Sequence, residues 1–357
     1  MKVSQKNYKR IVIKIGSSLF YRERGAFDAG VARQISEEVA ALIKSGREVV
    51  IVSSGAIAIG MQLLGLKSRP KELASLQAAA AVGQGELMNI YRSLFKEKSL
   101  NCGQVLLTWE DFDDRRRYLN AKNTALSLLR LGIIPVINEN DTVSTDEIRF
   151  GDNDRLSALV AALVSADLLI ILTDVDGLLA QDKRTLVKVV ADITPQVKSL
   201  ASPTDKKTCV GGMVTKLDAA RIAVGSGISC VVANGRSRGV ISGSVSDPGS
   251  FGTLFVPKGA QLAAKKRWIA FGTKTKGEVI VDDGARQALI NRKSLLAVGV
   301  TGVSGSFQQG DIVSIIDKHH REFARGKTCF SSSELEKLKG QRLGKEVIHC
   351  DNIVEVS

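Results

Sequence analysis

Short runs of apolar, often β-branched residues alternate with amphipathic segments through the first 250 residues of the chain. Such runs are typical of buried strands, and they cover Ile11–Ile15, Val49–Val52, Ile133–Ile137, Leu168–Leu172 and Ile228–Val232. The segments between them, such as Val31–Lys44 and Leu156–Val164, place apolar residues at helical spacing. Regular alternation of strand and helix predicts an α/β fold with a doubly wound, mostly parallel sheet. Ligands of such a sheet bind at the carboxyl ends of its strands.

The pattern changes after Pro257. The basic stretch Lys265-Lys266-Arg267 leads into short strand patterns separated by glycines, with one short helix expected near Gly284–Leu289. The expected strands lie within Gly277–Val281, Leu295–Val300 and Gly310–Ile316. We therefore expect an α/β domain over residues 1–257, a basic linker over 258–273 and a small β-rich domain over 274–357.

Composition supports a folded protein of two domains. The chain has 357 residues, of which 44% are hydrophobic and 24% charged, unlike disordered or collagen-like chains. It has no apolar run of membrane-spanning length, and its first ten residues are polar and basic, so we expect a cytoplasmic protein with no membrane partner. The net charge of +13 suits anionic ligands such as nucleotides or RNA. Residues 258–357 carry 17 Lys and Arg against 11 Asp and Glu, so they are the more basic part for their length.

The cysteines and histidines predict neither a disulfide framework nor a zinc site. The five cysteines are odd in number and widely scattered, which indicates reduced thiols. The histidines are confined to the end of the chain, and together with two cysteines their spacing matches no zinc pattern: these residues are His319, His320, His349, Cys329 and Cys350. The sequence therefore leaves any metal ligands unassigned.

Two candidate anion-binding loops follow the first two expected strands. Lys14 interrupts an apolar strand just before Gly16, and a buried lysine needs an anion to offset its desolvation. The alternative is that the lysine reaches solvent and the glycine only makes a turn. Ser54 and Gly55 begin a run of small residues that could hold a carboxylate or phosphate at a helix start, or could simply cap the helix. No Walker A sequence occurs in the chain, which argues against a P-loop kinase.

The densest group of polar residues lies on either side of residue 145. Asn138-Glu139-Asn140-Asp141 follows a buried strand, and Gly151-Asp152-Asn153-Asp154 precedes the helix expected at Leu156. A solvated turn would explain part of this pattern. So many carboxylates and amides exceed what capping needs, however, and could bind an ammonium group and organise catalytic cations.

Two further motifs suit a nucleotide. Thr173 and Asp174 end a buried strand, where they could contact a nucleotide or Mg²⁺ or form only a local turn. Gly211, Gly212, a hydroxyl and Lys216 precede the helical stretch Leu217–Val224, which reads as a second phosphate cradle or as a flexible loop with an exposed lysine.

Two lysines beside carboxylates fit the transfer of a phosphoryl group to a carboxylate. That reaction brings two anions together, and their repulsion at about 4 Å is on the order of 4 kcal/mol at an effective dielectric near 20. Positioned cations are the main catalytic device for such a transfer. A carboxylate nucleophile is already ionised at neutral pH, so the reaction needs no general base.

Taken in order, these motifs resemble the amino-acid kinase family, and within it the branch that phosphorylates the side-chain carboxylate of glutamate in the first step of proline synthesis. The most specific segments are Val52–Ala58, Asn138–Asp141 and Gly151–Asp154. The part after Arg267 resembles a PUA domain, an RNA-binding fold, through Val281–Ala285 and Gly305–Asp311.

The resemblance implies a role for each matching residue. Lys14 and Lys216 would contact the ATP phosphates and stabilise the transferring group, and Asp154 would hold both lysines in place. Glutamate would be bound by Ser54, Asp141, Asn153 and Asp152. The nucleotide would be lined by Lys14, Thr173, Asp174, Val210, Gly211, Gly212, Met213, Val214, Thr215 and Lys216.

The resemblance also implies ATP and Mg²⁺ as cofactors, a homo-oligomer (dimer or tetramer) and feedback inhibition by proline. There are two departures from the family pattern: Cys209-Val210 stands where the last loop usually has Gly-Thr, and Ser17 stands where threonine is common. Both bear on the details of nucleotide contact.

Two other functions remain open on the sequence. The first is another carboxylate kinase of the same fold, acting on acetylglutamate or aspartate. The second is an RNA-binding protein whose kinase fold is only a scaffold. The C-terminal part has few aromatic residues and no arginine-rich stripe, so base stacking and phosphate contacts are weakly provided.

Overall fold

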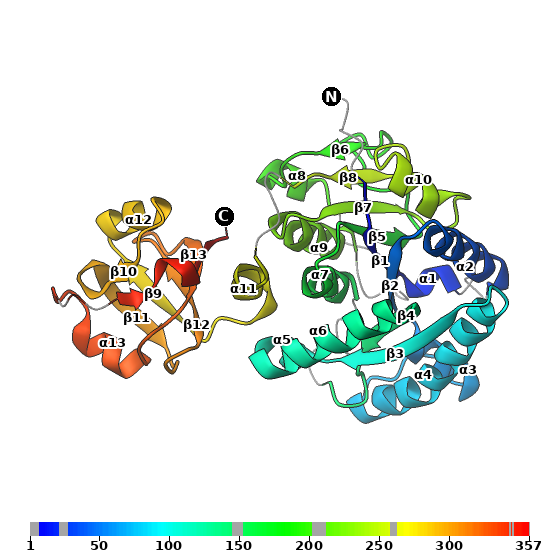
Figure 1. The fold of residues 1–357 in the computed structure, drawn as a ribbon, viewed down its shortest axis with the longest axis horizontal. Coiled ribbons are helices and arrows are strands. Elements are labelled where there is room, and N and C mark those ends of the chain that lie inside the picture. Colours follow the sequence, from blue (N-terminus) through cyan, green and yellow to red (C-terminus); the bar gives the residue numbers. More distant parts are fainter. Residues whose placement is uncertain are drawn as a thin grey trace. The chain divides into compact units, whose positions relative to one another are not determined.

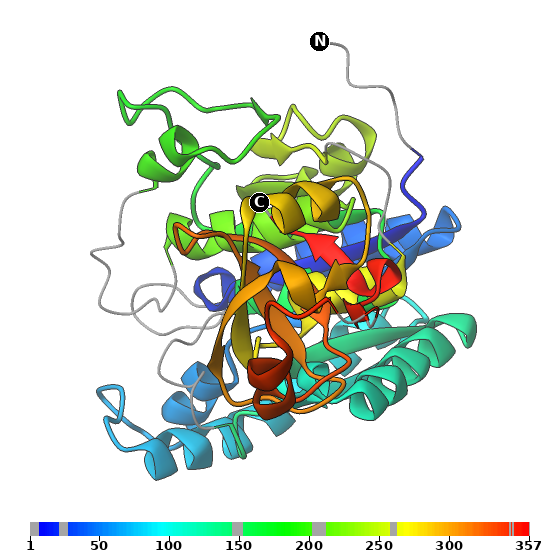
Figure 2. The same cartoon turned by 90° about the vertical axis from the view of Figure 1, so that its left-hand side faces the viewer.

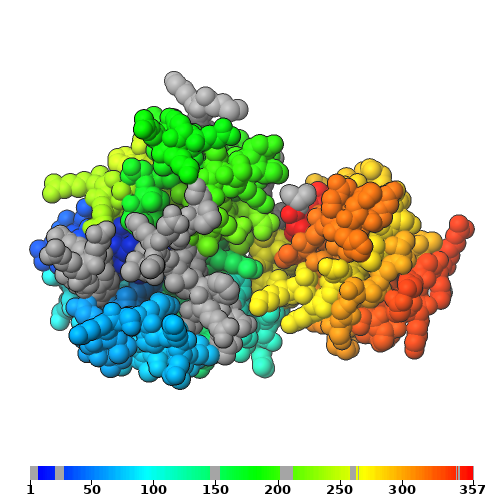
Figure 3. Space-filling view, turned by 180° about the vertical axis from the view of Figure 1, so that it is seen from behind, coloured from blue at the N-terminus to red at the C-terminus, as the bar shows by residue number. Residues whose placement is uncertain are grey.

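The computed structural model describes residues 7–20, 28–144, 153–201, 212–257, 263–342, 344 and 346–356. The chain divides into two compact units, residues 1–111 with 115–261 and residues 112–114 with 262–357. Figure 3 shows both in space-filling form, coloured from blue to red along the chain. In the part of the chain that the structure describes, no helix is both long and apolar enough to cross a membrane.

The first unit is built on an eight-stranded sheet with the order β3-β4-β2-β1-β5-β7-β8-β6 (Figure 1). All its neighbouring strands pair in parallel except β7 and β8, which confirms the predicted mostly parallel sheet. The strands are β1 (Arg10–Ile15), β2 (Glu48–Ser53), β3 (Asn101–Leu107), β4 (Ile133–Glu139), β5 (Leu168–Thr173), β6 (Val189–Val190), β7 (Ser229–Asn234) and β8 (Thr253–Phe255).

Helices lie on both faces of this sheet, as a doubly wound fold requires (Figure 1). One face carries α6 (Arg115–Arg130), α7 (Asn153–Val164) and α9 (Met213–Gly225), and the other carries α1 (Ser17–Phe20), α2 (Ala29–Lys44), α4 (Leu73–Lys96) and α10 (Val240–Ser246). The remaining helices of this part of the chain are α3 (Ala56–Leu63), α5 (Trp109–Asp113) and α8 (Pro195–Ser199). Strands β1 and β5 are almost wholly buried, because helices cover both of their faces.

Helices α3 and α4 pack with their backbones in direct contact. A Cβ atom on Gly60 would lie 1.7 Å from the carbonyl oxygen of Ala79, and one on Gly83 would lie 1.8 Å from that of Ala56. Only glycine allows this approach. Because α3 begins directly after β2, the contact fixes the middle of α4 relative to the carboxyl end of β2.

The second unit, whose residues from 262 on run from yellow to red in Figure 2, contains a five-stranded sheet with the order β11-β9-β12-β13-β15 and a separate pair, β10 and β14. Its strands are β9 (Gly277–Val281), β10 (Leu295–Leu296), β11 (Val300–Gly305), β12 (Ile312–Ile316), β13 (Glu322–Lys327), β14 (Glu346–Ile348) and β15 (Ile353–Glu355). Its helical segments are α11 (Ala264–Arg267), η2 (Trp268–Gly272), α12 (Asp283–Ile290), η3 (Ala297–Gly299), α13 (Ser332–Leu338) and η4 (Cys350–Asn352). Apolar residues of these elements form a core of their own, which confirms the small β-rich domain.

The structure adds three features to the sequence prediction. Strand β3 has a polar first half and an edge position, so it has no continuous apolar run to reveal it. Helix α13 is a second helix where one was expected; Ser331 and Glu334 form a capping box at its start. From residue 263 on, the segment expected as a linker forms α11 and η2, and Trp268 and Ile269 are buried.

Candidate functional site

Lys14 and Lys216 converge on one carboxylate, that of Asp154. The Nζ atom of Lys14 lies 2.5 Å from Oδ1 of Asp154, and Nζ of Lys216 lies 3.0 Å from Oδ2. Lys14 comes from β1, Asp154 from the first turn of α7 and Lys216 from the first turn of α9. Both lysines are buried, with side chains that are 7% and 8% exposed. The three residues therefore form one buried ionic cluster near the carboxyl edge of the sheet.

The cluster keeps Asp154 ionised. Burial by itself would raise the pKa of the Asp154 carboxyl group, but the ammonium groups of Lys14 and Lys216 outweigh burial and hold that pKa below its usual range. The hydroxyl of Thr215 lies 3.1 Å from Oδ2 and 2.8 Å from the carbonyl oxygen of Gly212, so its one proton is shared between these two acceptors. A carboxylate with three such partners fixes the positions of both lysines.

A second cluster of polar side chains lies beside the first and is built from carboxamides. The Nδ2 group of Asn153 donates to the carbonyl oxygen of Ser53 at 2.5 Å and to Oδ1 of Asn138 at 2.7 Å. The Nδ2 group of Asn138 donates in turn to Oε1 of Gln84 at 2.8 Å. Asn153 is 6% exposed and directly precedes Asp154, so the two clusters share the first turn of α7.

Ser54 and Asp141 complete the residues expected to bind substrate. Ser54 is half-buried, and its backbone N–H donates to the carbonyl oxygen of Ile15 at 3.2 Å, which ties the loop after β2 to β1. Asp141 is also half-buried and lies just beyond β4. Burial raises the pKa of its carboxyl group to about 6, although the positive charge of Arg69 opposes the shift. Asp141 therefore titrates within reach of neutral pH.

The described nucleotide candidates lie at the ends of β5 and β7 and at the start of α9. Thr173 is buried, and its hydroxyl donates to Oδ1 of Asp174 at 3.3 Å. The neighbouring strand β7 ends in Asn234, whose amide donates to Asp176 at 2.9 Å. The start of α9 supplies Gly212, Met213, Val214 and Thr215. The predicted site residues Asp152, Val210 and Gly211 lie outside the described residues.

Two residues in this region, Gln84 and Tyr91, were not predicted from the sequence. Both lie on α4, an alanine-rich helix that carries none of the motifs described above. The hydroxyl of Tyr91 lies 2.8 Å from Oγ of Ser53, and Tyr91 is 2% exposed. The one available signal was the polar side chain of Gln84 within an alanine-rich helix. That signal does not reveal its partner, Asn138, which lies 54 positions away in the sequence.

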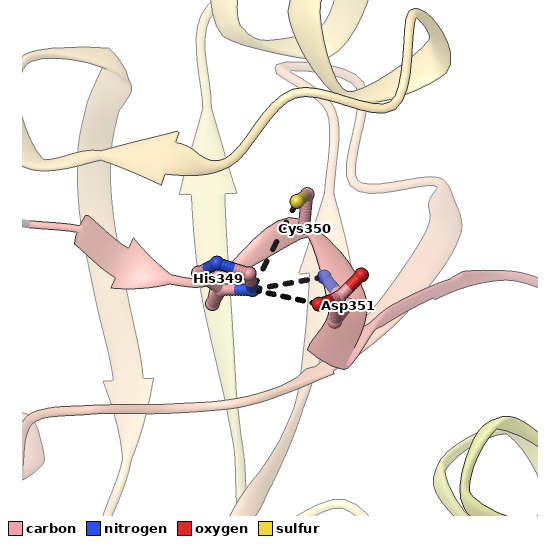
Figure 4. Close-up of side chains that lie close together, drawn as sticks. All are labelled: His349, Cys350 and Asp351. Atoms are coloured by element: carbon pink, nitrogen blue, oxygen red, sulfur yellow. Dashed lines mark hydrogen bonds and ion pairs between the residues drawn. The ribbon is translucent and has the colours of Figure 1, made fainter.

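A possible metal site lies in the second unit, in the turn formed by His349, Cys350 and Asp351 (Figure 4). Nδ1 of His349 lies 3.8 Å from the sulfur of Cys350 and 3.6 Å from Oδ2 of Asp351. However, Nδ1 already accepts a hydrogen bond from the backbone N–H of Asp351 at 3.1 Å. Its lone pair is thus engaged in closing the turn, and we assign no metal to this group. The four described cysteines are free thiols.

Comparison with known proteins gives two family matches. Residues 9–234 match the amino acid kinase family, and residues 277–350 match the PUA domain. Both are the families that the sequence resemblance named.

Several curated relatives that match the chain over almost its full length are named glutamate 5-kinase. The protein from Geobacter sp. (strain M21) is 46% identical over 366 residues, which cover 98% of this chain and 98% of the relative. The protein from Paraburkholderia phymatum is 45% identical over 365 residues with the same coverage. The protein from Moorella thermoacetica is 42% identical over 363 residues, covering 97% of this chain and 96% of the relative. Among solved structures, a UMP kinase from Bacillus anthracis aligns with a TM-score of 0.47 and 17% identity, covering 72% of this chain and 100% of that one.

Proposed function

Because this chain belongs to the amino acid kinase family, we propose that it uses ATP to phosphorylate the side-chain carboxylate of L-glutamate. The product is L-glutamyl 5-phosphate, and the reaction is the first step of proline synthesis. The choice of glutamate rests on one observation, the likeness over nearly the whole chain to relatives named glutamate 5-kinase. The buried cluster of Lys14, Asp154 and Lys216 is consistent with the chemistry.

In the proposed reaction an oxygen of the side-chain carboxylate attacks the γ-phosphorus of ATP. The new oxygen–phosphorus bond forms as the bond between the γ-phosphorus and the β,γ-bridging oxygen breaks, and ADP leaves with that electron pair. Lys14 and Lys216 offset the charge of the two anions and of the transferring group. Asp154 binds one ammonium group at each of its two carboxylate oxygens, and so holds both beside the transferring group in this proposal. No proton has to be removed from the nucleophile.

The substrate contacts follow from the charges of glutamate. The ionised carboxylate of Asp141 suits the α-ammonium group, and Ser54 and Asn153 supply hydrogen bonds at the ends of β2 and the start of α7. Asp152 remains a predicted contact outside the described residues.

For the nucleotide, Thr173, Asp174 and the start of α9 are the proposed contacts. Mg²⁺ is held in many kinases by one or two carboxylates together with the nucleotide phosphates, and the carboxylate of Asp174 at the end of β5 is suited to that role. When bound, Mg²⁺ would neutralise part of the phosphate charge. The homo-oligomer and the inhibition by proline stay predictions.

A hydroxamate assay tests the substrate. Hydroxylamine traps an acyl phosphate, so ATP, Mg²⁺ and the amino acid should give a hydroxamate with glutamate and far less with acetylglutamate or aspartate. The Lys216→Ala variant serves as the blank, because it removes one of the two cations. Hydroxamate from acetylglutamate or aspartate and none from glutamate would contradict the proposal.

A second function, RNA binding, is favoured by the match of residues 277–350 to the PUA domain and by the excess of basic residues after residue 257. Titration of the full chain with RNA in a gel-shift assay at several salt concentrations tests it. Binding through phosphates must weaken steeply as salt rises. Binding that does not respond to salt would count against this second function.

A further inference from the structure

Gln84 ends a chain of carboxamide groups that begins at the proposed substrate contact Asn153. Asn153 donates to Asn138, and Asn138 donates to Gln84. The chain joins three elements, because Asn153 belongs to α7, Asn138 to β4 and Gln84 to α4. A substrate contact on one element is therefore connected to a side chain on a distant one.

The orientation of every amide in this chain is fixed by one backbone group. The backbone N–H of Glu139 donates to Oδ1 of Asn138 at 2.9 Å, and in a side-chain amide only the oxygen can accept a hydrogen bond. The Nδ2 group of Asn138 must therefore face Gln84. Because that group is a donor, Gln84 must accept the hydrogen bond with its Oε1 atom. As a result Gln84 uses its acceptor, while its buried Nε2 group has no hydrogen-bond partner among the residues that the structure describes.

The position of Gln84 is fixed as firmly as its orientation. It follows Gly83, whose backbone touches that of Ala56 in the first turn of α3. Helix α3 itself begins directly after the Ser53–Gly55 loop, and Gly55 has a φ of 110°, in the left-handed region that favours glycine. The loop that carries Ser54 and the helix that carries Gln84 are thus held together by backbone contact.

Asn153 lies in the first turn of α7, outside the sheet, so the position of its side chain depends on that side chain's own hydrogen bonds. Its Nδ2 group is held between two acceptors, the carbonyl oxygen of Ser53 and Oδ1 of Asn138. If Asn138 turned, one of these acceptors would be lost and the Asn153 side chain could rotate. The backbone N–H of Glu139 and the acceptor on Gln84 hold the two ends of the Asn138 amide and together prevent that turn.

We propose that Gln84 is a positioning residue for substrate binding, which acts through Asn138 to hold the side chain of Asn153. The inference rests on the proposed function, since it takes Asn153 as a contact of the amino-acid substrate. Only the acceptor oxygen of Gln84 is used in the chain. What Gln84 contributes to the chain of amides is therefore an acceptor for the Nδ2 group of Asn138.

The experiment compares two replacements of Gln84. Gln84→Met has a similar shape but lacks the acceptor oxygen, whereas Gln84→Glu keeps an acceptor and lacks the unused donor. At about pH 8, where a glutamate side chain is ionised, Gln84→Met should raise the KM for glutamate about tenfold and leave kcat and the KM for ATP nearly unchanged. Gln84→Glu should stay within about threefold of the unchanged protein, as expected when one acceptor replaces another.

Asn89→Met is the matched control, because Asn89 is exposed on the same helix and its side chain hydrogen-bonds with Glu86 and Arg92, one turn away on that helix. Melting temperatures show that each variant is folded. The shift in melting temperature produced by glutamate gives a reading of binding that does not depend on turnover.

Two results would overturn the inference. If Gln84→Met leaves the KM for glutamate unchanged, Asn138 and Asn153 do not need the acceptor. If Gln84→Glu raises that KM as much as Gln84→Met does, the amide donor and not the acceptor matters. Failure of the proposed function is seen separately, because the unchanged protein would then give no hydroxamate from glutamate and no glutamate-dependent shift.

Discussion

Lys14 and Lys216 bind opposite oxygens of the same buried carboxylate, so the distance between their ammonium groups is set by the width of one carboxyl group. Two like charges this close would repel each other strongly in a buried site. The carboxylate of Asp154 removes most of that repulsion and leaves both groups able to face a bound anion. Electrostatic catalysis requires charged groups that are already in position before the reaction begins.

We expect Lys216→Ala to lower kcat about 10²- to 10³-fold, the usual cost of removing one electrostatic stabiliser of a transition state. Asp154 keeps its ion pair with Lys14 in this variant, so the chain should remain folded. Steady-state kinetics and a thermal melt measure the two effects. Lys198→Ala, at an exposed lysine on α8, is the control and should behave like the unchanged protein. Equal kcat values for the two variants would remove Lys216 from the reaction.

Asp154→Asn should destabilise the protein as well as inactivate it. The change leaves two buried ammonium groups without their counter-ion, and breaking a buried ion pair in this way costs about 3–5 kcal/mol. The control is Asp218→Asn, at an exposed position on α9. Denaturant unfolding near neutral pH measures the difference. A free energy of unfolding for Asp154→Asn equal to that of Asp218→Asn would show that the cluster adds no stability.

The pKa of Asp154 gives this stability a definite pH dependence. Because the two lysines hold the folded-state pKa below its usual range, the contribution is present at pH values above the unfolded pKa of about 4. It is lost as the pH falls through the folded-state pKa. The difference in the free energy of unfolding between the unchanged protein and Asp154→Asn should therefore become smaller in strong acid.

The sequence predicted the strands of the first unit well because most of them are buried and apolar along their whole length, as β1 and β5 are. Parallel strands end at one edge of a sheet, so polar residues after several strands had to gather there. Ser54, Asp141 and Thr173 were found in this way. Lys14 was found as a charge within an apolar strand, and Asn153 at a predicted helix start. The pairing of both lysines with Asp154 was expected only from the family resemblance.

The support behind the site could not be predicted. Gln84 and Tyr91 lie on α4 and contact the carboxyl ends of β4 and β2, and nothing in the local sequence of α4 identifies those partners. The close approach of Gly83 to Ala56 could not be predicted either. A glycine within a helix lowers helix stability, and the reason for it is seen only when the neighbouring backbone is known.

Gly83→Ala and Gly85→Ala should have opposite effects on stability, although both place one methyl group on α4. At Gly83 the new Cβ would lie 1.8 Å from the carbonyl oxygen of Ala56, so α3 and α4 must move apart, at a cost of about 1–3 kcal/mol or more. At Gly85 nothing lies within 4 Å, and alanine should stabilise the helix by up to about 1 kcal/mol. Chemical denaturation measures both, and similar values for the two variants would show that the backbones are not in contact.

Asp141 should make substrate binding sensitive to pH. Its carboxyl group has a pKa raised to about 6 by burial, so it loses its charge as the pH falls through that value. Glutamate keeps its own charges above about pH 5. If Asp141 binds the α-ammonium group, the KM for glutamate should rise about tenfold for each pH unit below 6.

Asp141→Asn supplies the control for that titration, since its side chain has a similar shape and cannot ionise. Its KM for glutamate should be high and flat over the same pH range. The raised pKa also means that the folded state binds this proton more tightly than the unfolded state, so the contribution of Asp141 to stability falls as the pH rises from about 4 to about 6. Asp141→Asn should lose that slope as well. A variant with the pH profile of the unchanged protein would assign the titration to another group and take Asp141 out of substrate binding.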